Sequence, residues 1–511
     1  MKMKILDCTL RDGGYYTNWD FDKGVVETYI RNLNALPIDY IELGYRNKTQ
    51  SEYLGQFGYC PVSTLQYIRS LSEKKLAIML NEKDCLSSDL ELLLNPIKGV
   101  VNMVRLAVDP KNFDRAIILA KVVKAMGFEV AYNTMYMSTW DDLKDFYPKL
   151  SQLDEVTDLF CMVDSFGSMT PELVRHTIEE VRRHTNVTLG FHGHNNLQLA
   201  LINTLTALEN GVEIVDATIL GMGRGAGNLN MELLLTYLNK HQKLHVDFNR
   251  LSEVIQAFEP LLKKCSWGTN LPYMLSGANS MPQKEVMAWV QNRVYSFNNI
   301  VRALDNRKEG VQDNAKYPVI SINQTYEQVL VIGGGPSVKE HIDGLKTFVQ
   351  QCETALVFAT ARYAELFSEI ECPKYYILVG NEGKRLAEKT KREEFSQICI
   401  LPPYPRTMGT AVPDFAKGQT YELASVDIIG KYADSCTTIA LQLAYELSHN
   451  DVYIVGYDGY SGVALTEKEL TLNKENREIF ELYKHNTSRQ LISLLPTLYT
   501  ELKVESLYSN L

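Results

Sequence analysis

The sequence lacks the features that would place the chain in a membrane, on nucleic acid or in a secretory route. No apolar run approaches the ~18 residues that a membrane-spanning helix needs. Lys and Arg number 52 against 62 Asp and Glu, and the net charge of −10 disfavours binding to nucleic acid or to an acidic membrane. The start MKMKILDC has no apolar core followed by a small-residue cleavage site, so we expect a cytoplasmic protein.

Paired cysteines are absent as well. The nine cysteines are scattered, odd in number and form no CxxC pair. This pattern disfavours a disulfide framework and a zinc site built on such pairs. We expect reduced and mostly buried thiols instead.

The first half of the chain does have a regular alternation of short apolar runs with amphipathic segments. The run MKILDC is followed by VVETYIRNLNAL and then YIELGY, and the pattern recurs as far as EIVDATILG. Repetition of this kind predicts parallel strands joined by helical crossovers. About eight strand-like runs precede residue 225, which favours a closed (β/α)8 TIM barrel over an open sheet. The predicted fold class is therefore α/β, and the apolar spacing within 248–305 predicts helices that extend the barrel.

The length of 511 residues and a change in composition predict two domains. We place the barrel with its helices at 1–305 and a linker at 306–324, which includes most of the polar stretch DNRKEGVQDNAKYP. A second strand–helix pattern begins at QVLVIGGGPSVKEHIDGLKTF. We therefore expect 325–511 to form a smaller Rossmann-like α/β domain.

Charged and metal-binding residue types gather at the carboxyl ends of the predicted barrel strands, where barrel enzymes carry their active sites. These residues are Arg11, Asp12, Glu42, Arg105, Asp164, Ser165, His192, His194, Asp216 and Asn228. The sharpest feature is His192-x-His194, because residues i and i+2 of a strand face the same side and can aim both imidazoles at one ion. With Asp12 from another strand end, they form a two-histidine, one-carboxylate set with open positions for a substrate.

Simpler interpretations stand beside these. The two histidines could be unrelated polar residues on a loop, and Asp12 could be a turn residue before Gly13-Gly14. Arg11 could be a salt-bridged residue at the barrel end, and Arg105 could belong to a salt bridge in the barrel interior.

Five motifs, in order, resemble those of the metal-dependent lyase and condensing-enzyme barrels. That superfamily includes 4-hydroxy-2-oxovalerate aldolase, hydroxymethylglutaryl-CoA lyase and isopropylmalate synthase. The motifs are DCTLRDGG, IELGY, VDSFGSMTP, GFHGHNN and GMGRGAGN, and the resemblance covers roughly residues 4–300. The segment WGTNLPYMLSG at 267–277 looks like the helical segment that follows the barrel in the pyruvate-specific aldolases, which favours the aldolase branch.

The resemblance implies roles for the residues that match. The implied ligands of a Mn²⁺ or Mg²⁺ ion are Asp12, His192 and His194, with Asn228 as an additional or supporting ligand. Arg11 would stabilise an enolate. The matches at the substrate end are Glu42, as a catalytic residue, with Asp164 and Ser165 as substrate-binding residues.

The implied chemistry is that of a class II aldolase, which is a carbon–carbon lyase. A 2-oxo acid chelates the metal, the bond is cleaved or formed through a pyruvate enolate, and an aldehyde is the second reactant. A base must take the proton of the C4 hydroxyl. The aldolases carry a histidine base three residues after the metal-binding aspartate, whereas this chain has Tyr15. We predict that Tyr15 is catalytic, as base, as a residue that orients a water or as a gate, with Tyr16 as the alternative.

A glycine turn, VLVIGGGPSVKEH at 329–341, is the main feature of the second half. Its candidate nucleotide-binding residues are Gly333, Gly334, Gly335, Pro336 and Ser337. Small residues let phosphates approach backbone amides, although a tight packing turn explains the same letters. The stretch resembles the GxGPSL opening of bacterial sialyltransferases and of related domains in surface-polysaccharide and pterin pathways, and DVYIVGYDGYSG resembles a later segment of theirs. That resemblance implies binding of a nucleotide or nucleotide-sugar.

Three functions are compatible with these patterns. The first is a pyruvate-forming aldolase fused to a nucleotide-binding domain, with a role in the sugar metabolism of a surface polysaccharide. The second is an acyl-CoA condensing enzyme of the same superfamily. The third is a glycosyltransferase-like nucleotide-binding protein with a vestigial barrel. The resemblance to barrel aldolases also implies a homo-oligomer.

Overall fold

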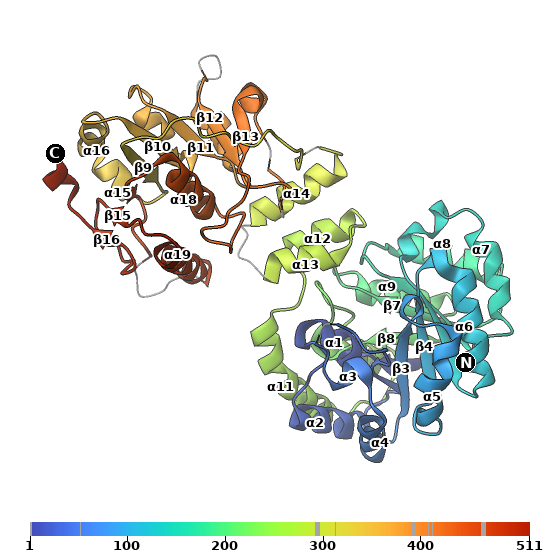
Figure 1. The fold of residues 1–511 in the computed structure, drawn as a ribbon. Coiled ribbons are helices and arrows are strands. Elements are labelled where there is room, and N and C mark those ends of the chain that lie inside the picture. Colours follow the sequence, from blue (N-terminus) through green and yellow to red (C-terminus); the bar gives the residue numbers. More distant parts are fainter. Residues whose placement is uncertain are drawn as a thin grey trace. The chain divides into compact units, whose positions relative to one another are not determined.

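The computed structural model describes residues 3–51, 53–291, 297–311, 313–390, 395–406, 408–410, 412–460 and 467–511. The chain divides into two compact units, Met1–Ala288 and Trp289–Leu511 (Figure 1). The division lies inside the predicted helical extension, of which residues 292–296 are outside the described residues. Within the described ranges, no helix is both long and apolar enough to cross a membrane.

Eight parallel strands close into a barrel in the first unit, because β1 is paired with both β2 and β8. The strands are β1 (Lys4–Asp7), β2 (Tyr40–Tyr45), β3 (Lys75–Asn81), β4 (Met103–Val108), β5 (Glu129–Thr134), β6 (Leu159–Asp164), β7 (Thr188–Gly193) and β8 (Ile214–Ala217). Every residue of β2, β4 and β6 is buried, as expected when helices cover the outside and side chains fill the inside. The predicted (β/α)8 barrel is confirmed.

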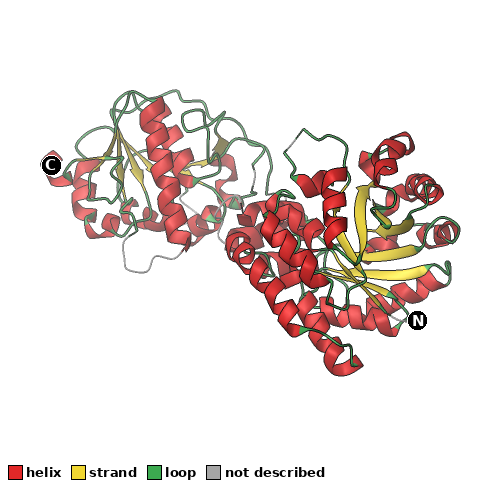
Figure 2. Ribbon diagram, turned by 90° about the horizontal axis from the view of Figure 1, so that it is seen from below, coloured by secondary structure: helices red, strands yellow, loops and turns green. Residues whose placement is uncertain are grey.

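Helices connect the barrel strands and form the outer layer, which Figure 2 shows in red around the yellow strands. They are α1 (Thr9–Thr17), α2 (Lys23–Leu33), α3 (Gln56–Tyr59), α4 (Val62–Leu71), α5 (Leu90–Leu94), α6 (Phe113–Ala125), α7 (Phe146–Lys149), α8 (Pro171–Arg182), α9 (Ala200–Glu209) and α10 (Met231–Gln242), with 3-10 turns η1 (Glu82–Asp84), η2 (Ser87–Asp89), η3 (Asn95–Ile97), η4 (Pro110–Asn112), η5 (Met137–Asp142), η6 (Leu150–Leu153) and η7 (Ile219–Gly221). Helix α8 shows why these segments are helical. Thr170 caps its N-terminus, Pro171 follows as the first helical residue, and Val174, Ile178 and Val181 recur on one buried face.

Three further helices follow the barrel, as the spacing within 248–305 predicts. They are α11 (Phe248–Cys265), α12 (Leu271–Ala278) and α13 (Gln283–Gln291). Helix α11 packs on α2, where the rings of Phe258 and Tyr29 lie 5.6 Å apart. The segment between α11 and α12 contacts the loop after β8, since Trp267 Nε1 donates to the Leu220 carbonyl at 2.9 Å.

The second unit is built on an open parallel sheet with the strand order β13-β12-β11-β10-β9-β14-β15-β16. Its strands are β9 (Gln328–Ile332), β10 (Thr354–Phe358), β11 (Lys374–Ile377), β12 (Ile398–Leu401), β13 (Thr420–Glu422), β14 (Val452–Val455), β15 (Leu491–Ser493) and β16 (Lys503–Val504). Its helices are α14 (Phe297–Lys308), α15 (Ser337–Glu340), α16 (Ile342–Val349), α17 (Glu382–Lys389), α18 (Cys436–Leu447) and α19 (Glu467–Asn486), with 3-10 turns η8 (Ala361–Phe367), η10 (Asp414–Gln419) and η11 (Leu507–Asn510). Two separate apolar clusters include alternate residues of β9 and β10, as expected for a sheet covered on both faces. This is the predicted second α/β domain, and its strand order reverses between β9 and β14.

The polar stretch predicted as a linker packs on the second unit. Helix α14 ends at Lys308, past the predicted boundary at 305, and within the second unit its Arg302 Nε donates to Asn381 Oδ1 at 2.6 Å. Asp313 accepts from Asn306 Nδ2 at 2.8 Å, and its carbonyl accepts from the Thr410 amide at 2.9 Å. Its low content of apolar residues therefore reflects polar contacts with the second unit.

Candidate active site

The carboxyl ends of the barrel strands surround a cavity of about 300 Å³. The predicted site residues that line it are Arg11, Asp12, Tyr15, Ser165, His192 and His194. Glu42, Asp164 and Asn228 lie behind this lining and are buried. The predicted residues thus form two layers, one that faces the cavity and one that supports it.

Arg11 and Asp12 are held by a helix, which corrects the prediction that they end the first strand and also the alternative that Asp12 is a turn residue. Strand β1 ends at Asp7, and both residues lie within α1. The two glycines are needed for close packing. A Cβ on Gly13 would lie 2.5 Å from Met222 Sδ, and a Cβ on Gly14 would lie 2.1 Å from the ring of Trp19.

The two histidines are oriented by hydrogen bonds at their Nδ1 atoms. His192 Nδ1 donates to Asp216 Oδ2 at 2.9 Å, and His194 Nδ1 donates to the Asp164 carbonyl at 2.8 Å. Each Nδ1 is engaged by an oxygen, which leaves Nε2 as the ring atom that can bind an ion, the usual arrangement of metal-binding histidines. Burial and the neighbouring His192 lower the pKa of His194 to about 3, so that its ring is neutral.

The carboxylate of Asp12 lies beside these nitrogens, 3.7 Å from His192 Nε2. Burial alone would raise its pKa, but Arg11 and the two histidines lower it below its usual value, so Asp12 is ionised. Asn228 Nδ2 donates to Asp12 Oδ2 at 2.6 Å. The buried Oδ1 atom of Asn228 has no hydrogen-bond partner among the described residues. A cation would satisfy that oxygen, so the donor set of Asp12, His192, His194 and Asn228 fits a divalent metal.

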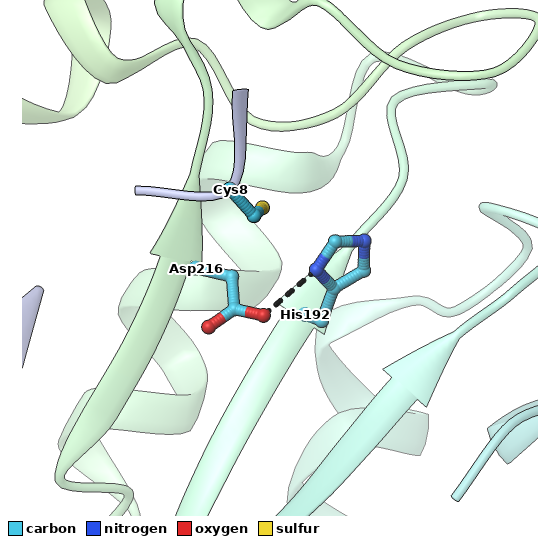
Figure 3. Close-up of side chains that lie close together, drawn as sticks. All are labelled: Cys8, His192 and Asp216. Carbon is cyan, nitrogen blue, oxygen red and sulfur yellow. Dashed lines mark hydrogen bonds and ion pairs between the residues drawn. The ribbon is translucent and has the colours of Figure 1, made fainter. Parts of the chain in front are cut away.

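A second group of possible ligands is formed by Cys8, His192 and Asp216, whose ligand atoms lie within 4.8 Å of one another (Figure 3). Here His192 uses Nδ1, and its other ring nitrogen points away from both partners. Asp216 also accepts from Arg105 Nη2 at 2.5 Å, so a guanidinium already neutralises it. Burial, Asp12 and Asp216 raise the pKa of the Cys8 thiol well above its usual value. This group is therefore better explained as the support behind His192 than as a metal site.

A chain of buried charges joins Arg11 to His192 beneath the cavity. Glu42 Oε2 accepts from Arg11 Nε at 3.0 Å and from Arg105 Nη1 at 2.9 Å, and Arg105 also binds Asp216. Arg105 is thus part of a salt bridge in the barrel interior. Glu42 is fully buried between two arginines. This location favours a role in which Glu42 holds Arg11 in position over one in which it contacts a substrate.

The loop after β6 supplies one lining residue. The carboxylate of Asp164 accepts from the amides of Ser168 and Met169 at 3.0 and 3.2 Å. Asp164 therefore orders its own loop, which explains why it does not reach the cavity as predicted. Ser165 does line the cavity, and its Oγ accepts from the Tyr136 amide at 2.8 Å.

Of the two tyrosines considered as base, Tyr15 lines the cavity. Its hydroxyl lies 3.1 Å from the hydroxyl of Tyr45, which the sequence analysis did not single out. Tyr16 donates to the Gly225 carbonyl at 3.1 Å, and burial raises its pKa well above the usual value. Tyr16 is therefore a structural residue in this conformation. Two of the lining residues that were not predicted, Tyr45 and Arg224, lie inside the quoted motifs IELGY and GMGRGAGN.

A separate cavity of about 680 Å³ lies within the second unit, at the carboxyl ends of β9, β10, β11 and β14. Its lining includes Gly333, Gly334, Gly335 and Pro336 of the glycine turn. Ser337 is different, because the carboxylate of Asp458 accepts from both its amide, at 3.0 Å, and its hydroxyl. The hydrogen-bond donors of Ser337 that were predicted to bind a phosphate are therefore used by the carboxylate of Asp458. That carboxylate would repel a phosphate.

Comparisons with known proteins match the barrel. Residues 101–257 match the HMGL-like family. The chain is 31% identical over 262 residues to 4-hydroxy-2-oxovalerate aldolase of Carboxydothermus hydrogenoformans, a match that covers 50% of this chain and 76% of that protein. It is 27% identical over 314 residues to oxaloacetate decarboxylase of Mycobacterium tuberculosis, covering 58% and 89%.

A solved structure is more similar still in sequence. The N-terminal domain of a proposed aldolase from Bacteroides vulgatus is 62% identical, and the match covers 59% of this chain and all of that domain with a TM-score of 0.57.

Proposed function

The chain belongs to the HMGL-like family, and from that premise we propose that its barrel is a divalent-metal-dependent class II aldolase. It would cleave or form a 4-hydroxy-2-oxo acid through a pyruvate enolate. The observation that carries this proposal is the donor set beside the cavity, where two imidazoles held through Nδ1 and an ionised carboxylate adjoin the Oδ1 of Asn228, which has no hydrogen-bond partner among the described residues. Imidazole, carboxylate and amide oxygen suit Mn²⁺ or Mg²⁺.

The residues around the donor set account for the remaining steps. When bound there, a divalent ion supplies the positive charge that polarises the oxygens of a 2-oxo acid. Arg11 uses Nε for Glu42 and Nη1 for Asp12, which leaves Nη2 to stabilise the charge that develops on an enolate oxygen. Tyr15 is the lining residue whose hydroxyl can exchange a proton with the 4-hydroxyl, with Tyr45 as its hydrogen-bond partner.

Exchange of the C3 hydrogens of pyruvate in D₂O, read by mass spectrometry, tests the proposal, because it reports enolate formation without a known aldehyde. We expect exchange with Mn²⁺ or Mg²⁺ and none with a chelator. In Tyr15→Phe we expect exchange to persist while cleavage of 4-hydroxy-2-oxovalerate falls by ~10²-fold or more, as for loss of a general acid–base. Absence of exchange with every divalent ion tried would contradict the aldolase, and full cleavage by Tyr15→Phe would remove Tyr15 from the mechanism.

We also propose that the cavity of the second unit binds a nucleotide or nucleotide-sugar. A cavity at the carboxyl ends of parallel strands, where the strand order reverses, is the usual ligand site of such sheets. The amide and hydroxyl of Ser337 already donate to Asp458, so phosphates would lie toward Arg362 and Arg385, which line the same cavity. A link to the sugar metabolism of a surface polysaccharide stays a prediction that rests on the sequence resemblance of the second half alone.

Calorimetric titration with CMP and UDP measures this binding. We expect the double variant Arg362→Ala/Arg385→Ala to bind at least ~10-fold more weakly, because charge-assisted hydrogen bonds to phosphate are lost. Lys384→Ala is the matched control, since this exposed cation is next to Arg385 in α17 but does not line the cavity. Lack of binding by the unmodified chain, or equal binding by the double variant, would contradict the assignment.

A homo-oligomer, a cytoplasmic location and the two alternative functions stay predictions. The exchange experiment separates both alternatives from the proposal. Neither an acyl-CoA condensing enzyme nor a protein with a vestigial barrel requires enolisation of pyruvate, so neither predicts exchange of its C3 hydrogens.

A further inference from the structure

Arg224 lies on the loop between β8 and α10 and lines the barrel cavity. Its guanidinium is 5.2 Å from the ring centre of Tyr15, close enough for a cation–π contact. The side chain is half-buried, and among the described residues it forms no hydrogen bond and no ion pair. A partly desolvated cation with five unused donors is costly unless it receives a partner, and in a cavity the partner can be a ligand.

The backbone that carries Arg224 is fixed on both sides. A Cβ on Gly223 would lie 2.8 Å from the side chain of Asn228, so this glycine packs directly on a proposed metal ligand. The carbonyl of Gly225 accepts from the Tyr16 hydroxyl at 3.1 Å and from the Gly268 amide at 3.3 Å. The loop therefore presents the guanidinium at a defined place, which reduces the ordering cost of binding.

The aromatic platform under Arg224 is fixed as well. The Tyr15 ring meets Trp19 edge-on with ring centres 5.0 Å apart, and its hydroxyl is bonded to that of Tyr45. Trp19 is anchored in turn, because its Nε1 donates to the Arg11 carbonyl at 2.8 Å. Arg224 is thus stacked on the residue proposed to serve the 4-hydroxyl, which places it beside the part of the substrate beyond C4.

The other charged lining residues of this cavity do not supply a counter-ion to Arg224. Asp12 is paired with Arg11, and Glu82 faces Arg115 at 3.6 Å and accepts from Asn112. Asp109, the third carboxylate of the lining, accepts from the Lys111 amide at 3.0 Å. Lys83 lines the cavity too and adds a second cation. Among the described residues none of these carboxylates forms an ion pair with Arg224, so its guanidinium is available to a bound molecule.

We propose that Arg224 binds an anionic group, a carboxylate or a phosphate, on the aldehyde half of the substrate. The substrate class is then a 4-hydroxy-2-oxo acid that bears a second acid group beyond C4. This inference rests on the proposed aldolase function and specifies its second reactant. Charge-assisted hydrogen bonds from a rigid arginine to such a group are worth ~10- to 10²-fold in binding.

Aldol addition of pyruvate to paired aldehydes tests the inference. Succinic semialdehyde is compared with butanal, which has the same carbon chain without the carboxylate, and glyceraldehyde 3-phosphate is compared with glyceraldehyde. We expect kcat/KM to be at least ~10-fold higher for the anionic member of one pair, and that pair identifies the group as carboxylate or phosphate. In Arg224→Ala the ratio of kcat/KM between the anionic and the neutral member of that pair should fall to about one, and Arg224→Lys should keep part of the preference. Arg175→Ala removes an exposed charge from α8 and should match the unmodified chain.

Two further readouts separate this inference from the proposed function. Pyruvate C3 exchange is measured on the same samples, and exchange by Arg224→Ala at the unmodified rate is expected. If exchange persists but Arg224→Ala slows both members of each pair equally, the inference is wrong and the aldolase stands.

If no addition product forms at all, binding of 2-oxoglutarate is compared with that of 2-oxopentanoate. Tighter binding of 2-oxoglutarate that is lost in Arg224→Ala supports the inference, and equal binding overturns it. Thermal melting of each variant checks that it is folded.

Discussion

His194→Ala is expected to lose its bound divalent ion and all metal-dependent exchange of pyruvate C3 hydrogens. The ring of His194 is held by the Asp164 carbonyl, which leaves Nε2 as the ligand atom. Without it, only Asp12, His192 and the amide of Asn228 remain, and one of two imidazole donors is gone. Metal content after equilibration with Mn²⁺ and dialysis is measured by inductively coupled plasma mass spectrometry, alongside exchange in D₂O.

Two further variants make this result specific. His245→Ala removes an exposed imidazole outside the barrel cavity and should retain both the ion and the exchange. Cys8→Ala tests the other donor group, formed by Cys8, His192 and Asp216, and should also retain the ion. Equal metal content in His194→Ala and the unmodified chain would rule out His194 as a ligand. Loss of the ion in Cys8→Ala alone would move the site to the opposite nitrogen of His192.

The barrel could be predicted from the sequence because its signals are local. Each strand is a short apolar run, and each crossover has its own apolar spacing and caps, as Thr170 and Pro171 show for α8. The spacing of His192 and His194 is local too, and both side chains line the barrel cavity with ring centres 4.9 Å apart. Alternate positions of a strand leave little freedom for such a pair.

The features that were missed depend on contacts distant in the chain. Arg11 and Asp12 were predicted to end the first strand, whereas they lie in α1, where Gly13 leaves room for the distant side chain of Met222. The pairing of Asp458 with Ser337 joins residues 121 apart, and no local pattern announces it. Hydrophobic periodicity could be read from the sequence, whereas polar pairs between residues far apart in the chain could not.

Arg11→Ala is expected to keep its metal and lose turnover and exchange by ~10²-fold or more, as when one oxyanion-stabilising group is deleted. Arg11 is held between Asp12 and Glu42, and Glu42 is held in turn by Arg105. This chain of buried charges holds the guanidinium of Arg11 in place, so Arg11 does not need to move when the enolate forms. Its donors are thus preorganised for the charge that develops, which is why their loss should act on kcat.

Arg11→Lys separates the charge of Arg11 from its geometry. Lysine keeps one positive charge but cannot bridge two carboxylates through Nε and Nη1 as arginine does. We therefore expect exchange between that of Arg11→Ala and that of the unmodified chain, with the metal retained in both variants. Arg175→Ala, which removes an exposed guanidinium from α8, controls for net charge. If Arg11→Ala also loses its metal, Arg11 acts by holding the Asp12 ligand in place, and stabilisation of the enolate is not needed to explain the lost turnover.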